Sequence, residues 1–339
     1  MLLISNADQY IGHCITSHLA YDPNIRSQLR VLCQNLIPCK QFMNQDIDVH
    51  QVDYHHPHQL SVAMRNVDHL VLVIGDNKDR VIHAKRLCQV ALRSGIKSII
   101  LVSHVGALCS NLTSSLSDFA LVENEIYNAD CAWTILRCDW IQQYFHLWTT
   151  YTEKNRSFPL PMDATTEFCP IDILDVCESV ASLLLLQQKN NITKIVDALD
   201  DQHIGQVYTL TGPRMINGKK LMKSLINATH YSSYRFLQVR PMDLQYYLKY
   251  LPKDIWFDAR LKRDRYRMHY DDFGSYSYRS NIFGPPSDLQ IQTFLDYFNW
   301  IFNTSSSICI PHVRLLTGKT PRSLDAFFKE NANSFKPRV

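Results

Sequence analysis

Residues 1–14 read MLLISNADQYIGHC, and this stretch decides the fold that we expect. The apolar run Met1–Ser5 is typical of a buried strand, and the polar turn after it leads into a helical pattern over Gly12–Ala20. A strand that passes through a short turn into a helix is the first unit of a parallel α/β sheet.

The same alternation of strand and helix continues through the N-terminal half of the chain. Runs rich in Val, Ile and Leu predict parallel strands that are buried on both faces. We expect strands at Met1–Ser5, Leu29–Gln34, Val49–Val52, His69–Ile74, Ser98–Ser103 and Trp133–Arg137. The helical patterns lie at Gly12–Ala20, Pro57–Met64, Asp79–Ser94 and Ser117–Ala129. This spacing predicts a doubly wound, mostly parallel Rossmann-type α/β sheet with right-handed crossovers.

The regularity weakens after about Asp139, and we expect a smaller, mostly helical part there. We therefore divide the chain into a Rossmann-like domain at 1–150 and a C-terminal part at 151–339 that binds substrate or a partner. The expected elements of this part are helices at Ile171–Gln188, Gly218–Thr229, Asp288–Phe302 and Pro321–Lys329, and a strand at Val207–Thr211. Residues 256–286 have little periodicity and predict an irregular segment.

Bulk composition restricts the class of protein. The chain of 339 residues is 46% hydrophobic and 20% charged, with a formal net charge of only +3. This charge gives no reason to expect direct contact with nucleic acid or a membrane surface. Ten cysteines without a C-x-x-C pair, and no apolar run long enough to span a bilayer, predict a reducing, intracellular compartment. We expect a cytoplasmic location, with the nucleus as the alternative.

The turn after the first strand is where such a sheet binds phosphates. Glycines permit a tight turn and a close approach of the pyrophosphate to the helix N-terminus. Only Gly12 remains of a G-x-x-G-x-x-G spacing, because Asn6 and Gln9 occupy the other two positions. Asn6 tolerates a left-handed backbone, whereas Gln9 projects toward the phosphates and Asp8 adds negative charge there. Taken alone, the motif favours a plain structural turn.

A wider pattern resembles the NmrA-like family of atypical short-chain dehydrogenases, which are NAD(P)-binding proteins. The resemblance starts at Tyr10-Ile11-Gly12 and covers most of the chain, apart from residues 256–286. It continues in register through QVDYHHPHQL from Gln51, VDHLVLVI from Val67, HAKRLCQVALRSGIKSIILVS from His83, WTILR from Trp133, PIDILDV from Pro170, YTLTGP from Tyr208 and LTGKTPRSLDAFFKEN from Leu316.

The resemblance implies a set of cofactor-binding positions. They are Asn6, Asp8, Gln9, Tyr10, Ile11 and Gly12 in the turn, Gln34 after the second strand, Asp53 after the third, Ile74 and Gly75 after the fourth, and Ser103 after the fifth. The turn would face the pyrophosphate, Asp53 the adenine and Ser103 the nicotinamide. The cofactor would be NAD or NADP, and the uncharged Gln34 gives no attraction to a 2′-phosphate, which argues against a preference for NADP.

No catalytic residue can be assigned from the sequence. Typical short-chain dehydrogenases use a Tyr-x-x-x-Lys pair, in which the Lys lowers the pKa of the Tyr. Here Cys131 stands four residues after Tyr127, and no Lys occurs between Lys97 and Lys154. His104 could donate a proton, although a lone His at a strand end is more often structural.

A group of histidines follows the third strand and raises the question of a metal. The group comprises His50, His55, His56 and His58. No Cys or second His group joins them in the sequence, so we interpret them as a solvated loop and expect no metal.

Three functions remain open. The leading hypothesis is a regulatory or redox-sensing protein that binds NAD(P) and contacts a protein partner. The alternative is an NAD(P)H-dependent reductase of a small carbonyl or quinone. The third is a scaffold that has lost nucleotide binding. These hypotheses predict binding without turnover, turnover, and neither, respectively.

Overall fold

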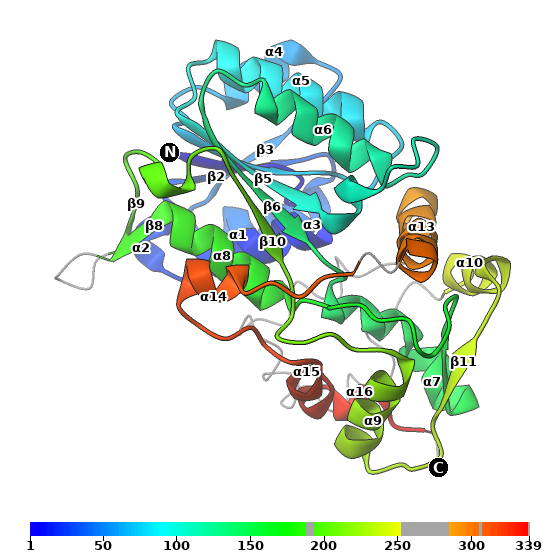
Figure 1. Ribbon diagram of the computed structural model, residues 1–339. Coiled ribbons are helices and arrows are strands. Elements are labelled where there is room, and N and C mark those ends of the chain that lie inside the picture. Colours follow the sequence, from blue (N-terminus) through cyan, green and yellow to red (C-terminus); the bar gives the residue numbers. More distant parts are fainter. Residues whose placement is uncertain (188–192, 252–284, 305–306, 338–339) are drawn as a thin grey trace.

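The computed structural model describes residues 1–187, 193–251, 285–304 and 307–337. Its centre is a seven-stranded sheet in the order β10-β6-β5-β4-β1-β2-β3, in which every neighbouring pair is parallel. The strands are β1 (Leu2–Ile4), β2 (Leu29–Cys33), β3 (Asp48–Gln51), β4 (His69–Val73), β5 (Ser98–His104), β6 (Ala132–Cys138) and β10 (Gln206–Leu210). The predicted Rossmann-type α/β fold is confirmed (Figure 1).

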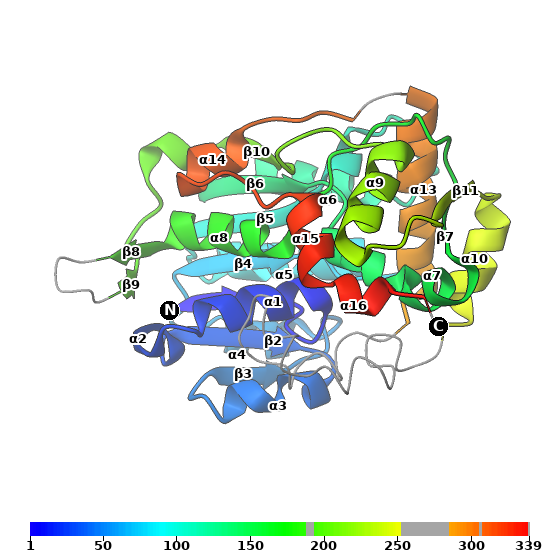
Figure 2. The same ribbon diagram turned by 90° about the horizontal axis from the view of Figure 1, so that it is seen from below.

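Helices cover both faces of the sheet because the strands are apolar on both sides. One face carries α1 (Tyr10–Leu19), α3 (Leu36–Met43) and α8 (Ile173–Leu184), and the other carries α4 (Pro57–Ala63), α5 (Arg80–Arg93) and α6 (Ser117–Tyr127). Figure 2 shows α1 and α8 side by side over the sheet, with the short α2 (Pro23–Arg26) near the edge. Each helix layer closes its own hydrophobic core against the strands.

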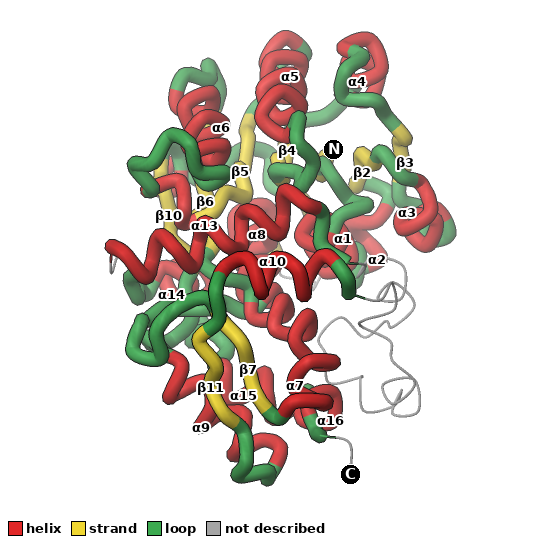
Figure 3. The backbone as a smooth tube through the Cα atoms, turned by 90° about the vertical axis from the view of Figure 1, so that its right-hand side faces the viewer, coloured by secondary structure: helices red, strands yellow, loops and turns green. Residues whose placement is uncertain are grey.

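The remaining elements build a third hydrophobic core beside the carboxyl ends of the strands. They comprise α7 (Thr149–Asn155), α9 (Gly218–Thr229), α10 (Pro241–Lys249), α13 (Asp288–Thr304), α15 (Leu324–Glu330) and α16 (Ala332–Phe335), with the parallel pair β7 (Ser157–Leu160) and β11 (Arg235–Gln238). The expectation of a mostly helical C-terminal part is confirmed. In Figure 3, α13 and α10 run across the end of the sheet.

Two elements from beyond residue 150 belong to the sheet and its cover. β10 pairs with β6 as an edge strand, and α8 packs against α1. α14 (His312–Thr317) then packs on α8. The division at residue 150 stays a prediction, but the two parts are tied together by these crossings.

The structure changes some expected bounds. The helix predicted at Ile171–Gln188 ends at Leu184, and the chain continues as β8 (Leu185–Gln187), which pairs with β9 (Thr193–Ile195). Leu185 is extended, with φ −114° and ψ 134°, so the helix ends inside the apolar run. The rest of this run forms the strand. The helix α3 was not predicted, since its residues LIPCKQFM include a Pro and span only two turns. Residues 252–284, most of the predicted irregular segment, lie outside the described residues.

Candidate functional site

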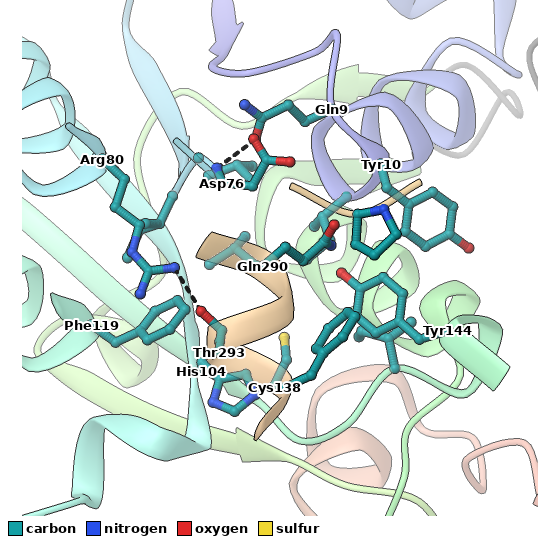
Figure 4. A pocket seen from close by; sticks show the side chains of 18 of the residues that line it. Gln9, Tyr10, Asp76, Arg80, His104, Phe119, Cys138, Tyr144, Gln290 and Thr293 are labelled. Atoms are coloured by element: carbon teal, nitrogen blue, oxygen red, sulfur yellow. Dashed lines mark hydrogen bonds between the residues drawn. The ribbon is translucent and has the colours of Figure 1, made fainter. Parts of the chain in front are cut away.

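A cavity of about 300 Å³ lies at the carboxyl ends of β1, β4, β5 and β6, under α13 (Figure 4). This is where open α/β sheets bind ligands. Seven of the predicted positions line it: Asp8, Gln9, Tyr10, Ile11, Ile74, Gly75 and Ser103. Asn6, Gly12, Gln34 and Asp53 do not line it. Asn6 and Gly12 shape the turn, whereas Gln34 and Asp53 follow the strands farther along the sheet.

The turn after β1 keeps a tight geometry with a single glycine. Asn6 adopts the left-handed conformation, with φ 50°, and its side-chain Nδ2 donates to the carbonyl of Val73 at 2.7 Å. A Cβ on Gly12 would lie 2.4 Å from the carbonyl oxygen of Asn6, so no other residue fits there without a shift of the backbone. Asn6 thus replaces one glycine, and Gly12 performs the close packing of helix and strand.

The Gln9 side chain bridges the turn after β1 and the segment that follows β4. Its side-chain Oε1 accepts a hydrogen bond from the backbone N–H of Asp76 at 3.0 Å. Figure 4 shows this bond crossing one end of the cavity. Gln9 is the N-cap residue of α1 and makes no side-chain capping bond to the helix. A phosphate group at this helix N-terminus would compete with the Gln9 side chain for the same space.

Asp8 points away from this helix N-terminus and toward β2. Its Oδ2 accepts hydrogen bonds from the backbone N–H groups of Gln34 at 3.0 Å and Asn35 at 2.8 Å. Its Oδ1 is buried and has no hydrogen-bond partner among the described residues. Burial raises the pKa of this carboxyl, and the hydrogen bonds from the backbone partly offset that effect. From the sequence we expect the Asp8 charge beside the pyrophosphate, but in the structure the carboxyl lies at the end of β2.

Gln34 and Asp53 make contacts outside the cavity lining. The Oε1 of Gln34 accepts a hydrogen bond from Asn77 Nδ2 at 3.2 Å. The Oδ1 of Asp53 accepts from the backbone N–H of His55 at 2.8 Å, which holds the loop after β3. Both residues follow strands next to the turn, on the side of the sheet away from β5.

The Ser103 hydroxyl points toward α6 and donates to Glu123 at 2.7 Å. Glu123 is 2% exposed and pairs with Arg137 at 2.6 Å. Tyr127 donates to the same carboxylate at 3.3 Å and does not line the cavity. The helix that would carry a Tyr-Lys pair thus carries Glu123, which pairs with Arg137 of β6.

Two further polar groups line the cavity: His104, which the sequence raised as a possible proton donor, and Asp139, which it did not raise. His104 Nδ1 accepts from the backbone N–H of Gly106 at 2.8 Å, which leaves the proton on Nε2. Burial lowers the pKa of His104 to about 3, so the ring is neutral. Burial also raises the pKa of Asp139 to about 6, and Tyr297 donates to Asp139 Oδ1 at 2.5 Å.

Aromatic rings form most of the remaining wall. Trp140 packs against Phe294 of α13 with ring centroids 4.8 Å apart, and against Tyr144 at 5.7 Å. The indole Nε1 of Trp140 is buried without a hydrogen-bond partner among the described residues. Arg80 ties α5 to α13 through a hydrogen bond to Thr293 Oγ1 at 3.2 Å. The sequence predicts the helix at Asp288–Phe302, but no periodic signal placed its aromatic residues over this cavity.

Residues 9–153 match a protein-family model described as NAD(P)H-binding. The sequence has no significant match among curated proteins. The chain carries an NAD(P)H-binding domain of the Rossmann type. The resemblance to NmrA-like proteins is confirmed in the fold.

Solved structures share the fold over almost their whole length. An NADPH-dependent quinone oxidoreductase from Escherichia coli, complexed with NADPH, is 18% identical, with a TM-score of 0.67 over 96% of this chain and 97% of the other. A triphenylmethane reductase from Citrobacter sp. complexed with NADP(H) is 13% identical, with a TM-score of 0.70 over 98% and 100%. NmrA, a negative transcriptional regulator in complex with NADP, is 13% identical, with a TM-score of 0.62 over 97% and 94%.

The residues of the NAD(P)H-binding domain fit a nicotinamide dinucleotide at two places. The unpartnered Oδ1 of Asp8 fits a ribose hydroxyl at the end of β2. The cavity beside His104 and Asp139 has room for a planar ring. Between them, the Gln9 bond to Asp76 must open for a pyrophosphate to reach the helix N-terminus. No helix in the described part of the chain is long and apolar enough to cross a membrane.

Proposed function

We propose that this protein binds NAD(H) in preference to NADP(H) and reduces a small planar carbonyl or quinone. The observation that carries the proposal is the aromatic cavity under α13, in which His104 and Asp139 lie at the ends of neighbouring strands. A protein that only sensed nucleotide would not need these two polar groups in the same cavity as the cofactor positions. The fold neighbours include both reductases and a regulator, so the fold leaves this choice open.

The preference for NAD(H) rests on Asp8. An acidic group at the end of the second strand accepts a hydrogen bond from the 2′-hydroxyl of the adenosine ribose. Here Gln34 occupies that strand end, and Asp8 brings its carboxylate to the backbone of Gln34 and Asn35. A 2′-phosphate would meet a carboxylate and find these two N–H donors already occupied. The fold neighbours solved with NADP(H) thus differ from the preference that we propose here.

The proposed chemistry divides between the cofactor and two side chains. A bound reduced nicotinamide supplies a hydride. His104 Nε2–H donates a hydrogen bond to the substrate oxygen, and its neutral ring stays a donor above about pH 3. Asp139 holds the proton that the reduced oxygen takes up, because burial keeps its carboxyl protonated below about pH 6. The rings of Trp140 and Phe294 hold a planar substrate and exclude water.

One observation favours a second candidate, a nucleotide-sensing regulator. The helix α6 places Tyr127 outside the cavity and pairs Glu123 with Arg137, so the usual proton-donating machinery is absent from the described residues. A sensor binds nucleotide without turnover and changes its affinity for a protein partner.

The test is oxidation of NADH with 1,4-benzoquinone or menadione as acceptor. We expect turnover by the wild type and a loss of at least tenfold in His104→Phe, with partial rescue in His104→Asn, whose amide can donate. The matched control is the melting shift with NADH, which should be the same in all three proteins. Nucleotide binding without turnover on either quinone would contradict the reductase and favour the sensor.

A further inference from the structure

A cluster of possible metal ligands lies outside the cavity, on the loop after β3 and the start of α5. It consists of His55, Asp79 and His83, whose ligand atoms all lie within 4.8 Å of one another. Of the four histidines in the sequence group, His50 pairs with Asp48 at 3.0 Å and His56 with Asp53 at 3.6 Å. Only His55 joins the cluster, and its partners come from a different element.

The local structure explains why these side chains meet. Asp79 is the N-cap residue of α5, and His83 stands four residues later, so both lie on one face of the helix. An N-cap Asp usually accepts a hydrogen bond from the first turn of its helix. Asp79 makes no such bond, and its carboxylate lies 3.6 Å from His55 Nε2. The carboxylate is therefore directed at the histidine and not at the helix.

The separations fit those of ligands around one ion. His55 Nε2 and His83 Nε2 are 3.0 Å apart, and His55 Nε2 and Asp79 Oδ2 are 3.6 Å apart. Tetrahedral bonds of about 2.0–2.1 Å place neighbouring ligand atoms roughly 3.3–3.4 Å from each other. The two separations lie on either side of that value. Small rotations of the exposed His55 and Asp79 side chains would therefore equalise them.

The surroundings fix the side chain of His83, whereas His55 and Asp79 are accessible to solvent. His83 is 6% exposed, and its ring stacks on Tyr54 at a centroid distance of 5.2 Å and an interplanar angle of 19°. His55 and Asp79 have side-chain exposures of 46% and 36%. The site thus offers three protein ligands and a position open to solvent, which a water molecule can fill.

The charges nearby act in both directions. Asp53 adds negative charge close to His55 and His83, which favours a cation. Arg86 acts against one, because its Nη1 lies 3.1 Å from His55 Nδ1. A donor at Nδ1 keeps the proton of His55 on Nε2, where the metal would bind. Arg86 must therefore release His55 when an ion binds, and this limits the affinity.

We propose that His55, Asp79 and His83 bind a divalent transition-metal ion of the Zn²⁺ class, with water as the fourth ligand. Two imidazoles and a carboxylate suit Zn²⁺, Ni²⁺ or Cu²⁺ and not Mg²⁺ or Ca²⁺, which prefer oxygen ligands. Without the ion, the two Nε2 atoms form a hydrogen bond with each other at 3.0 Å. The site is independent of nucleotide binding and of the reaction proposed above.

The experiment is a calorimetric titration of the full-length protein with Zn²⁺, and the absorption spectrum of the same protein with Co²⁺. We expect one ion per chain, and a loss of affinity of at least tenfold in His55→Asn and in Asp79→Asn. The matched control is His58→Asn, an exposed histidine in the first turn of α4, which should bind as the wild type does. Arg86→Gln should bind several-fold more tightly, because the Gln oxygen can accept the proton on Nδ1.

Both ligand variants change exposed side chains, and the melting curve without metal shows whether they fold. Equal affinity in the wild type and His55→Asn would overturn the proposal. So would an intense near-ultraviolet thiolate band of Co²⁺, which would place the ion on the cysteines. No binding of Zn²⁺ at submillimolar concentration would overturn it as well.

Discussion

Single residues around the β1 turn decide how a nucleotide could be held. Asp8 and Gln9 both depart from a glycine-rich motif, yet the structure separates their effects. Asp8 reaches the backbone of Gln34 and Asn35, where its charge suits a ribose hydroxyl. Gln9 bonds to Asp76 across the path that a pyrophosphate takes. We therefore propose that Asp8 confers selectivity for NAD(H) and that Gln9 lowers the affinity for every dinucleotide.

Replacing Gln9 by Gly should strengthen nucleotide binding. The change removes the bond to Asp76 and opens the helix N-terminus, while Gly is tolerated at an N-cap position. We expect the dissociation constants of NADH and NADPH to fall together, by about threefold to tenfold, the equivalent of roughly one net hydrogen bond. Titration calorimetry measures both. Weaker binding of both nucleotides would show instead that Gln9 contacts the phosphates.

At the scale of elements, the sequence predicts what depends on local pattern and not what depends on distant contacts. The seven expected strands of the sheet are present, and most of them are short apolar runs between turns. The residues that follow each strand, where cofactor-binding positions are expected, could also be located from the order of these strands. The direction of the Asp8 side chain and the place of α13 over the cavity could not, because they depend on Asn35 and Thr293, which are remote in sequence. The contact between His83 and His55 could not be predicted either, because the two residues are remote in sequence.

The replacement of Gly12 by Ala should destabilise the packing of β1, the turn and α1. The new Cβ would lie 2.4 Å from the Asn6 carbonyl oxygen, so strand and helix must separate. Overpacking of this kind costs about 1–3 kcal/mol, which lowers the melting temperature by several degrees. Ser17→Ala on the same helix is the control, since that buried hydroxyl has no hydrogen-bond partner among the described residues. Equal melting temperatures for Gly12→Ala and the wild type would contradict the described packing.

Over the whole molecule, the cavity joins the sheet to the C-terminal helices, and Asp139 lies at that junction. The carboxyl accepts from Tyr297 of α13 and from the backbone of Trp140. Burial raises its pKa from 3.8 to about 6. The folded state therefore binds this proton more tightly than the unfolded state does. Stability from this group is complete below about pH 4 and is lost as the pH rises through 6.

Asp139→Asn should remove this dependence on pH. A shift of about two pKa units corresponds to roughly 3 kcal/mol. The free energy of unfolding of the variant, relative to the wild type, should thus increase by a few kcal/mol between pH 4 and pH 7 and change little above that. Urea unfolding at several pH values measures it, and Asp243→Asn on the exposed surface of α10 is the control. If the free energies of unfolding of Asp139→Asn and the wild type differ by the same amount at every pH in that range, the pKa of Asp139 is not raised.

The melting shift with each nucleotide shows whether the chain holds NAD(H) through Asp8. The measurement compares NAD, NADH, NADP and NADPH at millimolar concentration with the wild type and with Asp8→Asn. A ligand at about one hundred times its dissociation constant stabilises a protein by roughly 2.7 kcal/mol. We predict larger shifts with NAD and NADH than with NADP and NADPH, and a loss of that difference in Asp8→Asn. No shift with any of the four nucleotides, or larger shifts with NADP and NADPH in the wild type, would show that Asp8 does not select NAD(H).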